Sequence, residues 1–206
     1  MYLIIDVETT GIPYTHHLPY GHYPSYKNLD MYDSARIVQI SMMLCNESFE
    51  MIEMKNFIIK TDGFTINNSE FHGITNEIST NNGTKFSDIV QLFSTYLKQV
   101  QHIVAHNIMF DVNIICSELF RLGEKTLISE INNKKLFCTM KHTKQMVKVE
   151  GKYNRIKDPS LAELYYFAFN KDIENAHNSE YDVINLHKII KYLFDMNKLN
   201  YNIKLV

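Results

Sequence analysis

The stretch Tyr2-Leu3-Ile4-Ile5-Asp6-Val7-Glu8-Thr9 decides the architecture of this chain. Its apolar run predicts a buried strand over 2–7 that ends where the acidic residues begin. Side chains alternate along a strand, so Asp6 and Glu8 are expected on the same face. Two carboxylates on one face repel each other, and a divalent cation such as Mg²⁺ or Mn²⁺ is the simplest partner that relieves the repulsion. A polar strand end that fades into solvent explains the pair as well, so this pattern alone is a weak signal.

The segments that follow predict a mixed α/β fold. Strands are expected at 36–45, 51–60, 102–105 and 135–139, and helices at 84–100, 108–122, 160–169 and 179–197. Strands come first and then alternate with helices, which predicts a five-stranded mixed sheet flanked by helices. The length of 206 residues fits one domain spanning 1–206.

Composition and charge exclude several classes of protein. The 45% hydrophobic content argues against a disordered chain, and no apolar run approaches the roughly 20 residues of a membrane span. No signal peptide is predicted, so an intracellular protein is expected, with Cys45, Cys116 and Cys138 as reduced thiols. The net charge of −2 argues against a protein that wraps duplex DNA, although it is compatible with one that grips a strand end.

Three further residues are candidates for the same site. Asp111 is expected in the first turn of a helix that follows a strand, where stabilisation of the helix dipole is the alternative role. Asp182 lies five residues after His177, and a capping box with Ser179 is its alternative role. Acids at strand and helix edges are expected to meet at one end of the sheet. Four carboxylates can hold two divalent metals about 3.5–4 Å apart, and a neutral histidine can take the proton of a nearby water.

Taken together, these motifs resemble those of the DEDDh, or DnaQ-like, 3′→5′ exonucleases within the ribonuclease H-like fold. The first motif is Asp6-Val7-Glu8-Thr9-Thr10-Gly11, and the second runs from His106-Asn107 to Phe110-Asp111. The third is His177 followed by Asp182, and a further family stretch appears as His72-Gly73-Ile74-Thr75. The chain also resembles the proofreading exonuclease domain of bacterial DNA polymerase III.

The resemblance implies a function and a role for each residue. It implies removal of nucleoside 5′-monophosphates from the 3′ end of single-stranded DNA, in proofreading or repair, with a DNA polymerase as a possible partner. An exoribonuclease of the same family is one alternative, and a non-catalytic nucleic-acid-binding or polymerase-associated module is another. The oligomeric state stays open. The implied ligands of two divalent cations are Asp6, Glu8, Asp111 and Asp182, the general base is His177, the implied substrate contacts are Val7, Thr9, Thr10, Asn107 and Phe110, and residues 72–75 are structural.

Two segments lie outside these motifs. The irregular stretch 12–33 is longer than the family needs, and its aromatic side chains either stack on single-stranded bases or pack the loop onto the domain. A basic stretch before the third motif either contacts phosphate or forms a solvated face. The loop residues expected to face water are Tyr14, His16, His17, Tyr20, His22 and Tyr23, and the basic residues are Lys134, Lys135, Lys141, Lys144, Lys148, Lys152, Arg155 and Lys157. No ligand spacing favours a metal site at the three loop histidines.

Overall fold

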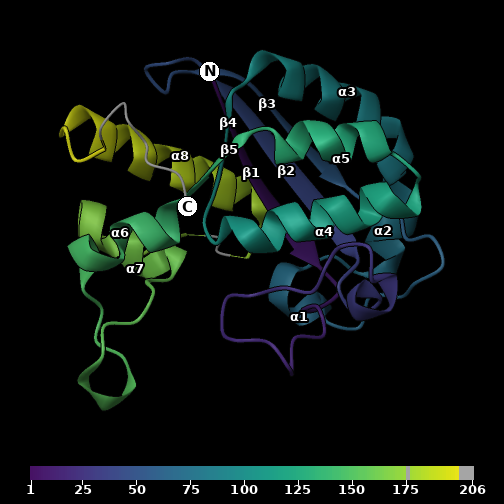
Figure 1. Cartoon of the computed structure of the whole chain (residues 1–206), viewed down its shortest axis with the longest axis horizontal. Coiled ribbons are helices and arrows are strands. Elements are labelled where there is room, and N and C mark those ends of the chain that lie inside the picture. Colours follow the sequence, from purple (N-terminus) through teal and green to yellow (C-terminus); the bar gives the residue numbers. More distant parts are fainter. Residues whose placement is uncertain (175–176, 200–206) are drawn as a thin grey trace.

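The computed structural model of the chain contains a five-stranded mixed sheet with the strand order β3-β2-β1-β4-β5 (Figure 1). The central strand β1 (Tyr2–Thr9) pairs antiparallel with β2 (Ile37–Cys45) and parallel with β4 (His102–Ala105). The outer strands are β3 (Met51–Ile58), antiparallel to β2, and β5 (Lys135–Cys138), parallel to β4. The predicted five-stranded mixed sheet is therefore confirmed.

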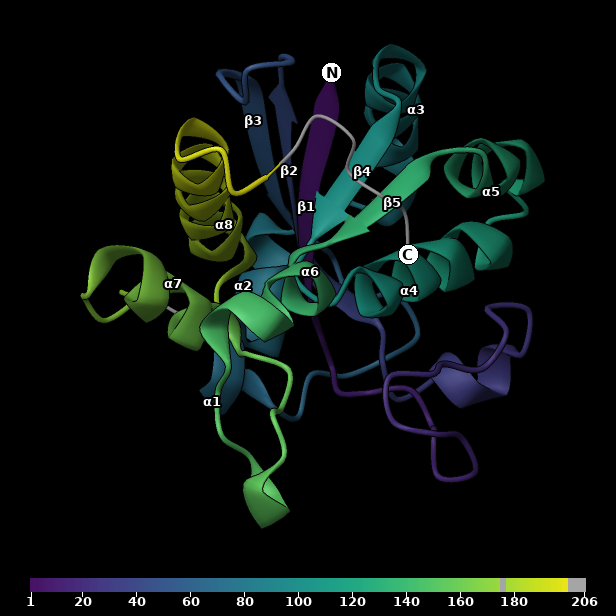
Figure 2. The ribbon, with the colours of Figure 1, turned by 60° about the vertical axis from the view of Figure 1, so that its left-hand side comes forward.

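Helices cover both faces of this sheet. On one face lie α3 (Phe86–Gln99), α4 (Ile108–Arg121) and α5 (Lys125–Asn132), and on the other α8 (Ser179–Asp195), against which α7 (Leu161–Phe169) packs. Figure 2 shows the two layers on either side of the strands. The arrangement is an α/β fold that buries both faces of β1, which explains why its sequence reads as a continuous apolar run.

The alternation along β1 places its acids on one face. Leu3 and Ile5 pack into the core beneath α3, α4 and α5, whereas Tyr2 and Ile4 pack into the core beneath α8. Because the side-chain period of a strand is two residues, Asp6 and Glu8 follow Tyr2 and Ile4 on the α8 face. The end of β1 is thus the point where a buried strand presents charged groups.

The structure describes residues 1–174 and 177–199, and within them it contains elements that the sequence pattern did not predict. Most of them are too short or too polar for an apolar period to mark a helix. The helix α5 is the exception, because it buries Leu127, Ile128 and Ile131 at helical spacing and the pattern was missed. Within this described part of the chain, no helix is long and apolar enough to cross a membrane. The added elements are α1 (Ser69–His72), α2 (Asn76–Asn82), α5, α6 (Thr139–Val147), and the 3₁₀ turns η1 (Leu29–Tyr32) and η2 (Lys152–Asn154).

Candidate active site

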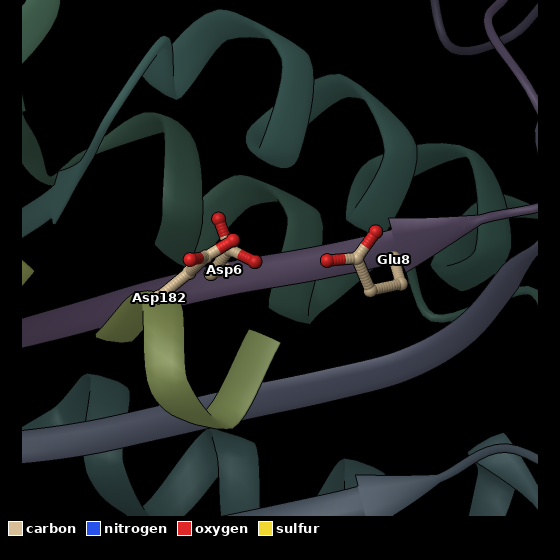
Figure 3. A group of neighbouring side chains, drawn as sticks. All are labelled: Asp6, Glu8 and Asp182. Carbon is tan, nitrogen blue, oxygen red and sulfur yellow. The ribbon is translucent and has the colours of Figure 1, made fainter. Parts of the chain in front are cut away.

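Three carboxylates converge at the end of β1. Asp6 and Glu8 come from the strand, and Asp182 comes from the first turn of α8. One carboxylate oxygen of each residue lies within 4.8 Å of the others. Figure 3 shows Asp6 and Asp182 with adjoining carboxylates, and Glu8 further along the strand. The structure therefore brings together three of the four predicted acids in a group that is suited to a cation.

The fourth acid, Asp111, borders this group from the first turn of α4. Its side chain is 2% exposed, and its Oδ1 accepts the backbone N–H of Val7 at 3.2 Å. The parallel pairing of β1 with β4 ends at Ile4, so the strand no longer supplies a partner for that N–H. The carboxylate replaces the missing strand partner and lies close enough to Asp6 to raise its pKa.

Burial and mutual repulsion make the ionised form of this cluster costly. Burial, together with the charges of Asp111, Asp182 and Glu8, raises the pKa of Asp6 well above its ordinary value. Burial and the charge of Asp182 raise the pKa of Glu8 to about 7. Burial raises the pKa of Asp182 to about 6, although the N–H and the charge of His177 act in the opposite direction. Such pKa shifts arise where like charges are held close together. Strongly shifted pKa values of this kind are typical of functional sites.

His177 lies beside the acids, immediately before α8. Its side chain is exposed, its φ is 66°, and its backbone N–H donates to Oδ2 of Asp182 at 3.2 Å. The N-cap of α8 is Asn178, whose side chain accepts the N–H of Glu180 at 3.1 Å. Asp182 therefore does not complete a capping box with Ser179, and this alternative role is wrong for it.

A buried polar network anchors the start of α8 to the sheet, and the sequence pattern did not reveal it. Gln39 on β2 accepts the N–H of Ser179 at 3.2 Å and donates to Asn56 on β3 at 3.0 Å. The hydroxyls of Ser41 and Ser179 lie 2.8 Å apart, and Asn56 donates to Glu180 at 3.0 Å. The only visible signal was a glutamine and a serine in an otherwise apolar strand. These residues hold the helix turn that carries Asp182.

The predicted substrate residues of the first motif form a braced turn. The Thr9 hydroxyl donates to the carbonyl of Gly11 at 2.5 Å, and the Thr10 hydroxyl donates to the carbonyl of Ser34 at 3.1 Å. Asn68 donates to the Thr9 carbonyl at 2.9 Å. Both hydroxyls are therefore engaged within the chain, and they shape the turn after β1. Val7 is buried, with its N–H bound to Asp111.

The long stretch 12–33 reaches the predicted substrate residues of the second motif through one tyrosine. Asn107, in the left-handed region with a φ of 70°, donates its side-chain N–H to the Tyr23 hydroxyl at 3.0 Å. The Tyr23 ring meets Phe110 edge-to-face, with centroids 5.9 Å apart. Tyr23 is half-buried, so the expectation that it faces water is wrong. The other five aromatic or histidine residues of the stretch are exposed as predicted: Tyr14, His16, His17, Tyr20 and His22.

The model of the RNase T family, which is described as Exonuclease, matches residues 3–190. The chain belongs to this exonuclease family. The match covers the end of β1, α4, His177 and the part of α8 that carries Asp182, and it confirms the predicted DnaQ-like membership. A search of curated protein sequences found no match. The predicted likeness to the proofreading domain of polymerase III stays a prediction.

Solved structures of exonucleases share the fold. Exonuclease X in complex with 5′-overhanging duplex DNA is 16% identical with a TM-score of 0.62, over 100% of this chain and 98% of that one. Exonuclease I of E. coli in complex with a dT13 oligonucleotide is 17% identical with a TM-score of 0.69, over 93% of this chain and 40% of that one. The zinc-bound complex of E. coli exonuclease I with single-stranded DNA is 17% identical with a TM-score of 0.70, over 96% of this chain and 41% of that one. The chain thus spans about two fifths of the length of exonuclease I.

Two histidines of this exonuclease-family chain are structural. His106 is held between the Thr139 hydroxyl at 3.0 Å and the Pro159 carbonyl at 2.9 Å, and burial lowers its pKa to about 4. It therefore links the end of β4 to the segments that begin α6 and precede α7. His72 accepts the N–H of Ile74 at 3.1 Å and Thr75 caps α2, which confirms the structural role predicted for residues 72–75.

The basic stretch divides into three parts. Lys135 aligns with His102 at the start of β4, so Lys134 and Lys135 lie at the end of the sheet opposite to the acids and are excluded from the site. Three other cations are used in ion pairs, since Lys141 and Lys144 both bind Asp158 and Lys157 binds Glu163. The remaining members are exposed, and among the residues that the structure describes none forms an ion pair: Lys148, Lys152 and Arg155.

The residues of the acidic cluster fit divalent cations. Oδ1 of Asp182 is buried and has no hydrogen-bond partner among the residues that the structure describes, which leaves a carboxylate oxygen available as a ligand. Buried oxygens of this kind are normally satisfied, so a cation explains an otherwise costly arrangement. A donor set made only of carboxylate oxygens suits hard ions such as Mg²⁺ or Mn²⁺.

Proposed function

We propose that the chain is a metal-dependent 3′→5′ exonuclease that hydrolyses the last phosphodiester bond of single-stranded DNA and releases nucleoside 5′-monophosphates. The observation that carries this proposal is the convergence of Asp6, Glu8 and Asp182, bordered by Asp111, at the end of β1 in an exonuclease-family fold. A module that had lost catalysis would have no reason to keep so costly a cluster of buried like charges.

In this proposal the four acids would hold two divalent cations, Mg²⁺ or Mn²⁺. When bound, such ions lower the pKa of a water and stabilise the negative charge that develops on the phosphate and the leaving oxygen. Asp182 would offer Oδ1 while its Oδ2 stays fixed by the N–H of His177. Asp111 would share its carboxylate with the Val7 N–H, which ties the site to the backbone of β1.

His177 would act as the general base. Its exposed side chain stands next to Asp182, within reach of a water that approaches the cluster from solvent. The imidazole takes the proton of that water as its oxygen attacks the phosphorus. The bond from phosphorus to the 3′ oxygen of the preceding nucleotide then breaks, and this oxygen is protonated to a hydroxyl. The strand is one nucleotide shorter and ends again in a 3′ hydroxyl.

The terminal nucleotide would bind between the first and second motifs. The braced turn at Thr9 and Thr10, with the backbone at Val7, would receive the sugar, and the half-buried Phe110 with Asn107 would contact the last bases. Single-stranded DNA is the preferred substrate in this proposal, which draws support from the DNA that the named exonuclease I and exonuclease X complexes contain. An RNA strand is the alternative, since recognition of the 2′-hydroxyl depends on contacts with the bound strand.

Residues 1–206 would form one exonuclease domain that acts inside the cell. A DNA polymerase is a candidate partner of this domain. Co-purification of the full chain with polymerase subunits of the organism that encodes it is the measurement that tests this association. Absence of any polymerase from the purified assembly would favour an enzyme that works without one.

The central test is degradation of matched DNA and RNA oligonucleotides that carry a 5′ label, with Mg²⁺ or Mn²⁺. We expect stepwise shortening from the 3′ end, release of nucleoside 5′-monophosphates, and resistance of strands with a blocked 3′ end. Asp6→Asn and His177→Ala should each lower the rate by at least about 100-fold. The exposed Asp62→Asn serves as the matched control. Equal cleavage by the wild type and Asp6→Asn would refute the proposed site.

A further inference from the structure

A small hairpin over residues 148–157 projects between α6 and α7. The N–H of Gly151 donates to the carbonyl of Arg155 at 2.8 Å, and the N–H of Lys157 donates to the carbonyl of Val149 at 3.0 Å. Its tip contains η2, and φ is positive at Tyr153 (59°) and Asn154 (55°). The hairpin is thus a defined turn with its own hydrogen bonds, and its tip residues point away from any core.

The surface of this hairpin is basic and aromatic. Its exposed cations Lys148, Lys152 and Arg155 form no ion pair within the described part of the chain, and Glu150 is the one acid in the segment. Tyr153 at the tip is 91% exposed. In a chain whose net charge is −2, this is a local concentration of positive charge around an unpacked aromatic ring.

The C-terminal end of the hairpin borders a hollow that it shares with Asn107. This hollow has a volume of about 680 Å³ and lies at the base of the hairpin. It is lined by Lys157 and Asp158 at the end of the hairpin, Lys141 of α6, Tyr20 of the stretch 12–33 and Asn107 before α4. Asn107 is one of the proposed nucleotide contacts. Figures 1 and 2 show the hairpin and the stretch 12–33 leaving the molecule at the end of the sheet where β1 ends. The hollow therefore connects the proposed nucleotide contact Asn107 with the end of the hairpin.

We propose that the hairpin binds the nucleic-acid strand several nucleotides behind its 3′ end. Lys148, Lys152 and Arg155 pair with phosphates, and Tyr153 stacks on a base, which is the combination that grips single strands without sequence preference. Arms of roughly four residues extend about 15 Å from their base, so the tip contacts nucleotides that the catalytic site does not touch. This inference rests on the proposed function, because it takes the acidic cluster as the position of the 3′ end.

The test compares substrates that do and do not reach the hairpin. The variants are the pair Lys152→Ala with Arg155→Ala, and Tyr153→Ala, assayed on a trinucleotide and on strands of about 20 nucleotides of DNA and of RNA. For the long strands we expect KM to rise about tenfold, the salt dependence of KM to weaken, and the saturated rate to stay unchanged. For the trinucleotide we expect no change. The matched control removes the same charge at the opposite end of the sheet, through Lys134→Ala with Lys135→Ala.

Three results would overturn the role of the hairpin: an unchanged KM for long strands, an equal loss on the trinucleotide, or an equal loss in the control pair. Binding of a labelled long strand by an Asp6→Asn protein, with and without the hairpin substitutions, separates this inference from the proposed function. If the wild type leaves 3′ ends intact, the proposed function fails, and the binding comparison still decides whether the hairpin holds the strand.

Discussion

The carboxyl group of Glu8 lowers the folding stability of the metal-free protein. Its folded-state pKa of about 7 lies above its ordinary value of 4.5, because of burial and the charge of Asp182. Between these values the folded protein holds a proton that the unfolded chain has released. In the metal-free protein the stability therefore falls as pH rises through this window, and the loss is complete above the folded pKa.

Replacement of Glu8 by glutamine should remove this penalty. We expect Glu8→Gln to stabilise the metal-free protein at about pH 8 by up to about 3 kcal/mol, to have little effect near pH 5, and to reduce nuclease activity. Thermal unfolding in a chelator at both pH values measures the first two effects, with the exposed Glu47→Gln as control. A stabilisation that is the same at both pH values would contradict the electrostatic origin.

Tyr23 offers a residue-scale test of the long loop. Its hydroxyl accepts the side-chain N–H of Asn107, and Tyr23→Phe removes this acceptor while it keeps the ring against Phe110. The loss of one such bond corresponds to about 1 kcal/mol, so we expect KM for oligonucleotides to rise severalfold with kcat nearly unchanged. Tyr14→Phe, in the exposed part of the same loop, should behave as the wild type. An unchanged KM in Tyr23→Phe would show that the contact does not position Asn107.

Among the elements, the start of α8 is held to the sheet by the buried polar network of Gln39, Ser41 and Asn56 as well as by apolar packing. Gln39 both accepts from the start of α8 and donates to β3, so Gln39→Ala leaves the Ser179 N–H without its acceptor and removes one of the two donors to Oδ1 of Asn56. We expect a loss of about 1–3 kcal/mol in unfolding free energy and a larger fall in kcat than in substrate affinity, because Asp182 shifts. Denaturant unfolding and single-turnover rates measure the two effects. The exposed Gln101→Ala provides the control, and a kcat equal to that of the wild type would remove Gln39 from the positioning of Asp182.

The elements also show which parts of the fold a sequence pattern can predict and which it cannot. The strand β1 and the helices α4 and α8 carry apolar periods over many residues, and each was predicted together with its acids. The short polar helices α1 and α2 have no such period, since tertiary contacts and the Thr75 cap define them. The Ser41–Ser179 contact joins residues 138 positions apart, and nothing local in the sequence pairs them. The same limit applies to Tyr23, whose place at Asn107 depends on the path of a long irregular loop.

At the scale of the whole molecule, cation binding and folding should be coupled. An ion that binds the folded acids and not the unfolded chain raises the melting temperature by mass action. We expect Mn²⁺ or Mg²⁺ to raise it more at about pH 8 than near pH 5, because the raised pKa values of Glu8 and Asp182 leave these ligands protonated in acid. Calorimetry with and without the ion tests this, and Asp6→Asn should lose most of the shift. A shift that does not depend on pH would place the ion elsewhere.

The contact between Asp111 and the Val7 N–H has a consequence for how the molecule can be observed. Beyond Ile4 this amide is shielded by a side chain of α4 instead of a neighbouring strand, so its exchange with solvent deuterium reports on the carboxylate and not on the sheet. Any event that draws Asp111 toward a cation or protonates it changes the exchange at Val7 while the amides of β2 stay protected. One backbone proton in the centre of the fold therefore serves as a built-in reporter of the state of the acidic cluster.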